Sequence, residues 1–258
     1  TFNDWKTKVT KTSFRFLQTL YNLGPSPEPN LTVLWSDQLP EWFKKFCAQV
    51  SIDTSSVQYE NDDLMRSCRW SDDYWIACCV SYQEIWKRIQ HFWARCNLWK
   101  TLLLAINWWK EEDEWIQVID PTLFESVENE DWTLNYDKVL NNFKKAMENV
   151  ARVYAKTMYV IHYMHDKYYY EKAQMAFLDS NYWVDIAYWI AGISIVADSL
   201  SAIKYTKVKP IRNEQWIAKW FETEWEFPMY WNDDDRVDTI AVEVQKFFME
   251  ELRKYKAY

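Results

Sequence analysis

Glycine is almost absent from this chain, and tryptophan is abundant. The 258 residues include 2 Gly and 18 Trp, whereas ordinary usage would supply roughly 18 glycines. A folded chain needs glycine where the backbone takes a positive φ or where two segments approach closely. The shortage therefore constrains the turns of this chain more than any other sequence feature does.

Tryptophan stands at places where glycine is expected. Trp108 and Trp109 follow a predicted long helix, where a glycine would ordinarily end it. We hypothesise that the source organism reads one codon as glycine and that this codon is written here as tryptophan. The alternative is a natural protein that is rich in tryptophan. The hypothesis predicts that Trp108, Trp109, Trp225 or Trp231 lie at helix ends or turns, some with positive φ.

Composition is typical of a soluble globular protein, with 49% hydrophobic and 26% charged residues. The length allows one large domain or two small ones. Basic residues are outnumbered and do not cluster, which argues against a nucleic-acid surface. The longest apolar stretch, 186–196, is too short to span a bilayer, and we interpret it as a buried helix. No signal peptide is evident, and because residue 1 is Thr we expect the natural N-terminus to lie upstream.

The cysteines argue against a disulfide framework. There are five, an odd number, and none has Cys-x-x-Cys spacing, which also argues against a zinc ribbon. A reducing, cytoplasmic compartment is the natural inference.

Helical and strand patterns alternate along the chain. Helical spacing predicts helices at 11–24, 40–50, 83–107, 171–178, 187–205 and 237–254, and one long helix or a broken pair of helices at 137–167. Strands are predicted at 31–35, 51–57 and 207–212, while 74–80 is a short apolar run. The proline-rich segment 24–30 predicts an ordered loop, and the acidic segment 110–131 an exposed insertion. This alternation favours an α/β architecture with mainly parallel strand pairing.

The adjacent pair Cys78 and Cys79 is the sharpest candidate for chemistry. Two buried cysteines acting as small hydrophobic residues are one interpretation. A vicinal disulfide would be strained. The third interpretation is a nucleophile paired with a redox or radical relay. That role requires a tight loop in which both sulfurs face one cavity.

Other polar residues allow both structural and functional interpretations. Phe92 and Arg95 would share one face of the predicted helix, so Arg95 could bind a substrate carboxylate or form a structural ion pair. His162 and His165 are also three apart, but the sequence places no third metal ligand, and we expect no metal site. The acidic runs 62–63, 72–73 and 233–235 predict helix caps and solvated turns.

Several long motifs resemble the pyruvate formate-lyase family of glycyl radical enzymes. Residues 50–66 (VSIDTSSVQYENDDLMR) and 72–81 (DDYWIACCVS) are similar to the active-site region of that family. So are 13–17, 24–30, 161–167, 197–205 and 208–212, and the resemblance runs along nearly the whole chain. It implies that residues 1–258 are an interior segment of a single catalytic domain, part of a ten-stranded α/β barrel. The helices would lie outside the barrel, and the cysteine loop would reach into its centre.

The resemblance also implies a mechanism. A glycyl radical, which lies outside this chain, takes hydrogen from Cys79, and the radical passes to Cys78. The Cys78 thiyl adds to the carbonyl carbon of pyruvate, and cleavage leaves an acetyl thioester on Cys78 while the other product becomes formate. Coenzyme A then takes the acetyl group. Arg95 matches the arginine that holds the pyruvate carboxylate, and Phe92 matches the aromatic residue beside it.

The resemblance further implies a radical-SAM activating enzyme and a homodimer. Related dehydratases use one cysteine with a nearby glutamate, so the pair favours the formate-lyase branch. Two alternative functions stay open. One is a 2-ketobutyrate formate-lyase, and the other is a non-catalytic paralogue or fragment that only binds a partner. This segment by itself is expected to be inactive. The family has glycine at positions matching Trp5, Trp86, Trp93, Trp108, Trp109, Trp189, Trp225 and Trp231.

Overall fold

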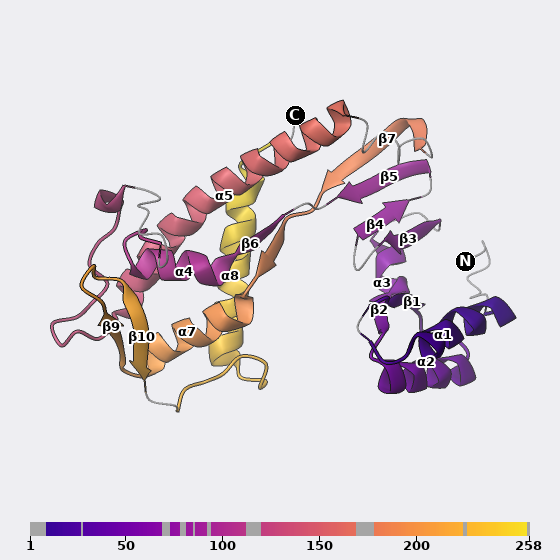
Figure 1. Cartoon of the computed structure of the whole chain (residues 1–258), viewed down its shortest axis with the longest axis horizontal. Helices are drawn as coiled ribbons and strands as arrows, with labels where there is room; N and C mark the ends of the chain where they lie inside the picture. Colours follow the sequence, from indigo (N-terminus) through magenta and orange to yellow (C-terminus); the bar gives the residue numbers. More distant parts are fainter. Residues whose placement is uncertain are drawn as a thin grey trace. The chain divides into compact units, whose positions relative to one another are not determined.

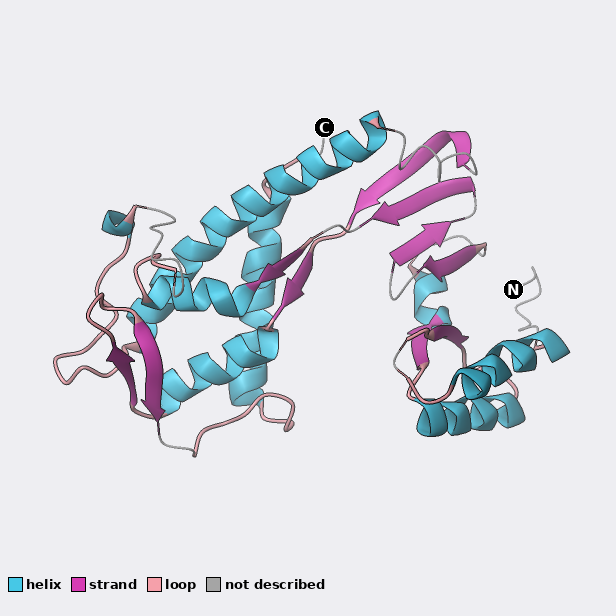
Figure 2. Ribbon diagram, in the orientation of Figure 1, coloured by secondary structure: helices cyan, strands magenta, loops and turns pink. Residues whose placement is uncertain are grey.

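The computed structural model describes residues 9–26, 28–68, 73–77, 81–84, 86–91, 94–111, 120–168, 178–223 and 226–256. These residues belong to two compact units. One unit comprises Thr1–Phe92 and Tyr170–Ala187, and the other comprises Trp93–Tyr169 and Tyr188–Tyr258. Figures 1 and 2 show the elements of both units, and each unit is described by itself.

The first unit combines a helical part with a four-stranded sheet. Its elements are α1 (Lys11–Leu23), β1 (Leu31–Trp35), α2 (Glu41–Thr54), β2 (Val57–Asn61), α3 (Asp62–Ser67), β3 (Tyr74–Ala77), β4 (Ser81–Glu84), β5 (Trp86–His91) and β7 (Leu178–Ile186). Strands β1 and β2 pair in parallel. Leu17, Leu20, Val33, Phe43 and Val50 form the centre of the core that α1, α2 and β1 share.

The predicted boundaries of the first two helices need small corrections. Helix α1 ends before Gly24, which has a φ of 81°, as expected of a helix-ending glycine. Its N-cap is Thr10, whose amide donates to Ser13 Oγ at 3.2 Å, so Thr12 and Ser13 lie inside the first turn. Helix α2 continues through Thr54, and the strand predicted to begin at residue 51 is therefore wrong there.

The predicted helix at 83–107 is wrong over most of its length. Residues 81–84 form β4, 86–91 form β5, and the helix begins only at Leu98. The sheet has the order β3-β4-β5-β7, in which β5 pairs in parallel with β7, about 90 residues further along the chain. The local spacing of apolar residues carries no information about pairing with a distant strand. Here the pairing with β7 decides the conformation, against the local helical pattern.

The second unit is mainly helical. Its elements are β6 (Arg95–Asn97), α4 (Leu98–Ile106), the 3-10 helix η1 (Pro121–Leu123), α5 (Tyr136–Lys167), β8 (Trp189–Ala191), α7 (Ile193–Tyr205), β9 (Val208–Arg212), β10 (Ala218–Thr223) and α8 (Asp235–Arg253). Helix α5 packs against α4 and α8, and α7 packs against α8. Helix α8 buries Val237, Ile240, Val244 and Phe248, as its amphipathic pattern predicts, whereas Phe247 is only half-buried.

Two short strands precede helices in this unit. Strand β6 leads directly into α4, and β8 leads through Gly192 into α7. The predicted helix at 187–205, which contains nearly all of the apolar stretch 186–196, therefore begins only at Ile193. Gly192 has a φ of 84°, and a Cβ there would lie 3.0 Å from Trp99 Cβ. Only glycine allows α4 and the start of α7 to come this close.

The chain is a mixed α/β protein. Among the described strands, three pairings are parallel (β1–β2, β5–β7 and β6–β8) and three are antiparallel (β3–β4, β4–β5 and β9–β10). The expectation of mainly parallel pairing is therefore not met. The described strands form one four-stranded and three two-stranded sheets, without a closed barrel among them.

The described part of the segment 110–131 is less exposed than predicted. Phe124 and Val127 are buried, and so is Glu128. Glu128 forms an ion pair with Arg212 of β9, and Phe124 packs against the Trp109 ring. The helix predicted at 171–178 lies almost wholly outside the described residues, and Leu178 begins β7.

The tryptophan prediction is confirmed where the structure describes it. Trp108 follows α4 with a φ of 51°, Trp109 has a φ of 61°, and Trp231 has a φ of 71° in the turns that precede α8. Trp86, Trp132 and Trp216 also have positive φ. Trp5, Trp93 and Trp225 lie outside the described residues.

Candidate active site

The cysteine pair lies between the two strands of a hairpin. Strands β3 and β4 pair antiparallel, with Ala77 opposite Ser81. Cys78 and Cys79 themselves lie outside the described residues. The flanking strands thus agree with the expectation of a cysteine loop, while the placement of the two sulfurs stays a prediction.

A buried polar cluster anchors the start of this hairpin. Tyr74, the first residue of β3, donates from its hydroxyl to Asp62 Oδ1 at 2.6 Å, and Arg66 Nε lies 3.0 Å from Asp62 Oδ2. Burial and the hydrogen bond to Asp62 raise the pKa of Tyr74, so its hydroxyl remains a donor. Asp62 is buried, and it is therefore not the solvated turn residue that was predicted.

An aromatic contact braces the hairpin across its two strands. The ring of Tyr74 stacks on that of Tyr82 in β4, with ring centroids 5.5 Å apart and planes inclined by 24°. Both tyrosines are buried. Cross-strand aromatic pairs of this kind stabilise antiparallel sheets. The strands that lead into and out of the cysteine pair are thereby fixed by side chains of their own unit.

Of the three described cysteines, Cys47 and Cys96 are buried and only Cys68 is exposed. Burial raises the pKa of the Cys47 thiol to about 11 and that of Cys96 to about 12, so both are protonated at neutral pH. Cys68 is exposed and forms no disulfide. Thiolate chemistry is therefore not expected of Cys47 or Cys96.

Arg95 is the predicted site residue that the structure describes. It begins strand β6 and not a helix, so the expectation that Phe92 and Arg95 share one helix face is wrong. The short strand forms because β6 pairs in parallel with β8, with Arg95 opposite Trp189. The guanidinium carbon lies 5.5 Å from the centroid of the Trp189 ring. Phe92 lies outside the described residues.

Tyr154 ties the starts of these two strands to helix α5. Its hydroxyl donates to the carbonyl oxygen of Ala94 at 2.6 Å and accepts from the Trp189 amide at 3.0 Å. Burial raises the pKa of Tyr154, which keeps the hydroxyl protonated. Tyr154 is not among the predicted site residues, although a tyrosine on the apolar face of a helix signals a buried hydroxyl that needs partners.

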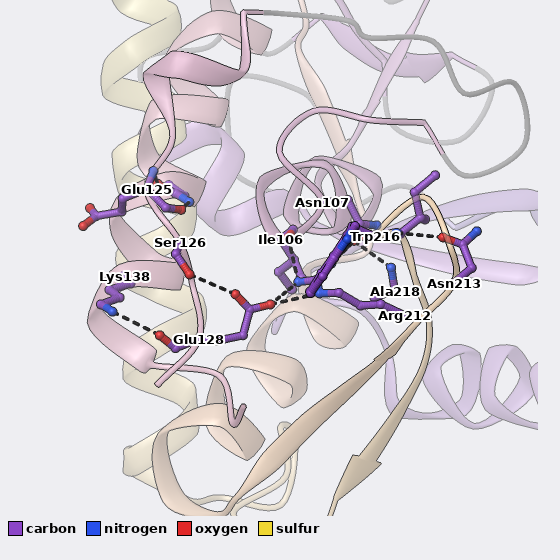
Figure 3. A network of polar contacts seen from close by, with 12 residues as sticks. Ile106, Asn107, Glu125, Ser126, Glu128, Lys138, Arg212, Asn213, Trp216 and Ala218 are labelled. Carbon is purple, nitrogen blue, oxygen red and sulfur yellow. Dashed lines mark hydrogen bonds and ion pairs between the residues drawn. The ribbon is translucent and has the colours of Figure 1, made fainter. Parts of the chain in front are cut away.

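A second polar network lies around Arg212 in the same unit (Figure 3). Its guanidinium pairs with Glu128 and donates to Asn107 Oδ1 at 3.0 Å, to the Ile106 carbonyl at 3.2 Å and to the Trp216 carbonyl at 2.7 Å. Arg212 and Glu128 are both nearly inaccessible to solvent. Because every one of these donors is used within the protein, the network is structural and joins α4 to β9 and β10.

The described residues offer no metal centre. They contain no group of three or more His, Cys, Asp or Glu residues arranged to hold a metal ion. His162 is buried within α5. Its structural interpretation stays a prediction, as does that of His165. Among the described residues, no helix is both long and apolar enough to cross a membrane.

The comparison with protein families settles the family of this chain. The family model described as "Pyruvate formate lyase-like" matches residues 2–258. This chain belongs to that family. The resemblance inferred from the motifs is thereby confirmed.

A curated relative and a solved structure agree with this family. Formate acetyltransferase 1 of Escherichia coli (strain K12) is 52% identical over 255 residues, which is 99% of this chain and 33% of the relative. The chain thus spans about a third of the relative's length. A structure described as "1,2-propanediol Dehydration in Roseburia inulinivorans; Structural Basis for Substrate and Enantiomer Selectivity" has a TM-score of 0.67 at 17% identity. The match covers 98% of this chain and 36% of that one, and at this identity it shows the fold alone.

Proposed function

We propose that this chain carries the two-cysteine site of a formate C-acetyltransferase, which cleaves pyruvate and transfers its acetyl group to coenzyme A. The observation that carries the proposal is the 52% identity to formate acetyltransferase 1 across nearly the whole chain. The adjacent Cys78 and Cys79, between the paired strands β3 and β4, support it. We further propose that residues 1–258 belong to one catalytic domain, in a barrel that further chain completes.

The two thiols would divide the work. Cys79 would give up a hydrogen atom to the glycyl radical outside this chain and in turn take one from Cys78. The Cys78 thiyl would add to the carbonyl carbon of pyruvate, and cleavage of the carbon–carbon bond would leave the acetyl group on Cys78 as a thioester. The carboxyl fragment would leave as a radical anion, which takes up a hydrogen atom and becomes formate. Adjacent positions suit this division, because one sulfur becomes a covalent acyl carrier while its neighbour handles the hydrogen atom.

Arg95 would hold the substrate carboxylate. A guanidinium presents parallel N–H donors that match the two carboxylate oxygens. Phe92 would pack beside the substrate. Coenzyme A would be the second substrate, a radical-SAM enzyme would install the glycyl radical, and the active form would be a cytoplasmic homodimer.

The test uses the full-length protein, activated without oxygen and supplied with pyruvate and coenzyme A. Cys78→Ser and Cys79→Ser should each abolish formation of formate and acetyl-CoA, because serine neither carries the acetyl group as a thioester nor relays the hydrogen atom. Cys68→Ser is the matched control, since Cys68 is exposed, and it should retain activity.

The acetyl group also gives a direct signal. Without coenzyme A, a peptide containing Cys78 should gain one acetyl group, and this gain should disappear in Cys78→Ser. Activity that survives in either serine variant would overturn the assignment. Comparison of kcat/KM for pyruvate and for 2-ketobutyrate distinguishes the two formate-lyase functions.

A further inference from the structure

The two glycines written in this sequence both adopt left-handed backbone conformations. Gly24 has a φ of 81° and Gly192 a φ of 84°. Residues with a Cβ are disfavoured in this region, and a bulky residue there is an outlier. Positive φ is therefore a local marker for the positions at which this chain requires glycine.

Tryptophan dominates the remaining positions of this kind. Among the described residues, eight others have positive φ, and six of these are tryptophan. They are Trp86, Trp108, Trp109, Trp132, Trp216 and Trp231. The other two are Ser55 and Asp233, a small residue and one that tolerates the left-handed region. No property of the indole ring favours this conformation.

Burial of the side chains does not account for the strain. The exposed fractions of Trp86, Trp132, Trp216 and Trp231 are 51%, 56%, 52% and 88%. These rings contribute little packing that could offset a strained backbone. Trp109 is buried, but its indole N–H has no hydrogen-bond partner among the described residues, which is itself unfavourable.

Backbone contacts hold these conformations in place. The Trp109 amide donates to the Leu104 carbonyl at 2.7 Å, and the Trp216 amide donates to the Asn213 carbonyl at 3.0 Å. The Trp216 carbonyl accepts from Arg212, as Figure 3 shows. None of these bonds involves an indole ring, so glycine could form each of them unchanged.

One contact of an indole ring belongs to the same region. The Arg212 guanidinium lies 4.7 Å from the centroid of the Trp108 ring. Arg212 already donates to Glu128, Asn107 and two carbonyl oxygens, so loss of the ring would leave no donor of the guanidinium unsatisfied. The hydrogen bonds of Arg212 therefore do not depend on the Trp108 ring.

We propose that the native polypeptide carries glycine at these six positions, because its source organism decodes as glycine a codon written here as tryptophan. The inference rests on backbone conformation and composition, and it does not depend on the proposed function. The φ criterion also distinguishes positions that require glycine from positions where tryptophan is native. Trp35 lies in strand β1 without positive φ, and its ring contacts that of Tyr59 with centroids 5.4 Å apart, so it remains tryptophan.

The experiment is peptide sequencing by tandem mass spectrometry of the protein isolated from its source organism. Trypsin should release peptides 101–110 and 213–219, which contain Trp108, Trp109 and Trp216. Each replacement of tryptophan by glycine lowers the mass by the difference between an indolylmethyl group and a hydrogen atom. We expect two such losses in 101–110 and one in 213–219.

Peptide 16–44 is the internal control, because it contains Trp35. We expect its fragment ions to place tryptophan at residue 35. Tryptophan at 108, 109 and 216 would overturn the proposal. The exposed Trp132 and Trp216 rings, with centroids 5.9 Å apart, would then be a real aromatic surface feature. Glycine at residue 35 would instead overturn the conformational criterion that separates the two classes of position.

Discussion

Arg95 is held by a contact that a substrate carboxylate can replace. Its guanidinium carbon lies 5.5 Å from the centroid of the Trp189 ring. An exposed cation–π contact contributes about 0.5–1 kcal/mol, whereas a hydrogen bond to a charged group contributes about 1.5–3 kcal/mol.

Arg95→Lys in the full-length, activated enzyme should lower kcat/KM for pyruvate by roughly tenfold or more. Lysine keeps the positive charge but cannot form two parallel hydrogen bonds to a carboxylate, and loss of one such bond accounts for this factor. Steady-state kinetics across pyruvate concentrations measures the effect. Circular dichroism should show that the variant remains folded.

Arg88→Lys is the control for this substitution. Arg88 lies in β5 and forms an ion pair with Asp185, with Nε 3.5 Å from Oδ2. A partly exposed pair of this kind contributes little, and lysine can retain it. We expect near-normal kinetics. If Arg95→Lys behaved in the same way as this control, Arg95 would be a structural residue and not a substrate ligand.

At the scale of elements, the start of β6 depends on a side chain from a distant helix. Tyr154 of α5 donates to the Ala94 carbonyl and accepts from the Trp189 amide, which are 60 and 35 residues away in sequence. Without the hydroxyl, both backbone groups would lose a partner in a buried setting, where each loss costs about 1–3 kcal/mol. Tyr154 is therefore a positioning residue for Arg95.

Tyr154→Phe in the full-length enzyme should raise KM for pyruvate several-fold while kcat changes less, because Arg95, the residue proposed to bind the carboxylate, would be displaced while the two thiols stay unchanged. Measured KM and kcat separate this effect from a general loss of folded protein. Tyr163→Phe is the control, since Tyr163 lies on the same helix but is exposed. A drop in kcat alone, with unchanged KM, would contradict the positioning role.

Elements with local signals could be predicted from the sequence. Helix α1 ends at Gly24, the helix predicted at 137–167 is α5, and α8 follows its amphipathic pattern. Strand β5 could not be predicted, because its spacing of apolar residues also fits a helix and its parallel partner β7 is far away in sequence. The same holds for β6, whose pairing with β8 removes Arg95 from the predicted helix.

The candidate site divides in the same way. The adjacency of Cys78 and Cys79 is visible in the sequence, and the family motifs give it a meaning. The side chains that brace the hairpin and position Arg95 are not visible. Tyr74 meets Asp62, and Tyr154 meets Ala94 and Trp189, only after the chain folds. The family motifs thus name the proposed reacting groups, whereas the side chains that hold the neighbouring strands become visible only in the structure.

At the scale of the whole molecule, the six tryptophans with positive φ decide whether the chain as written is stable. A left-handed conformation costs a residue with a Cβ about 1–2 kcal/mol, so six of them cost about 6–12 kcal/mol together. Entire proteins are stable by only about 5–15 kcal/mol. Glycine also makes the unfolded chain more flexible, at about 0.4–1 kcal/mol per site, and this smaller term does not reverse the balance.

We therefore expect two versions of the full-length protein to differ in solubility and in cooperativity of unfolding. Both are produced in a host that translates every codon as it is written. The version with tryptophan at the six positions should be largely insoluble or unfold without cooperativity. The version with glycine at 86, 108, 109, 132, 216 and 231 should be soluble and show a sigmoidal urea transition. Adding Trp35→Gly to the second version should lower its stability, because the half-buried Trp35 ring packs in β1 against Tyr59. Equal midpoints for the first two versions would mean that the tryptophans are native and that their strain is offset elsewhere in the protein.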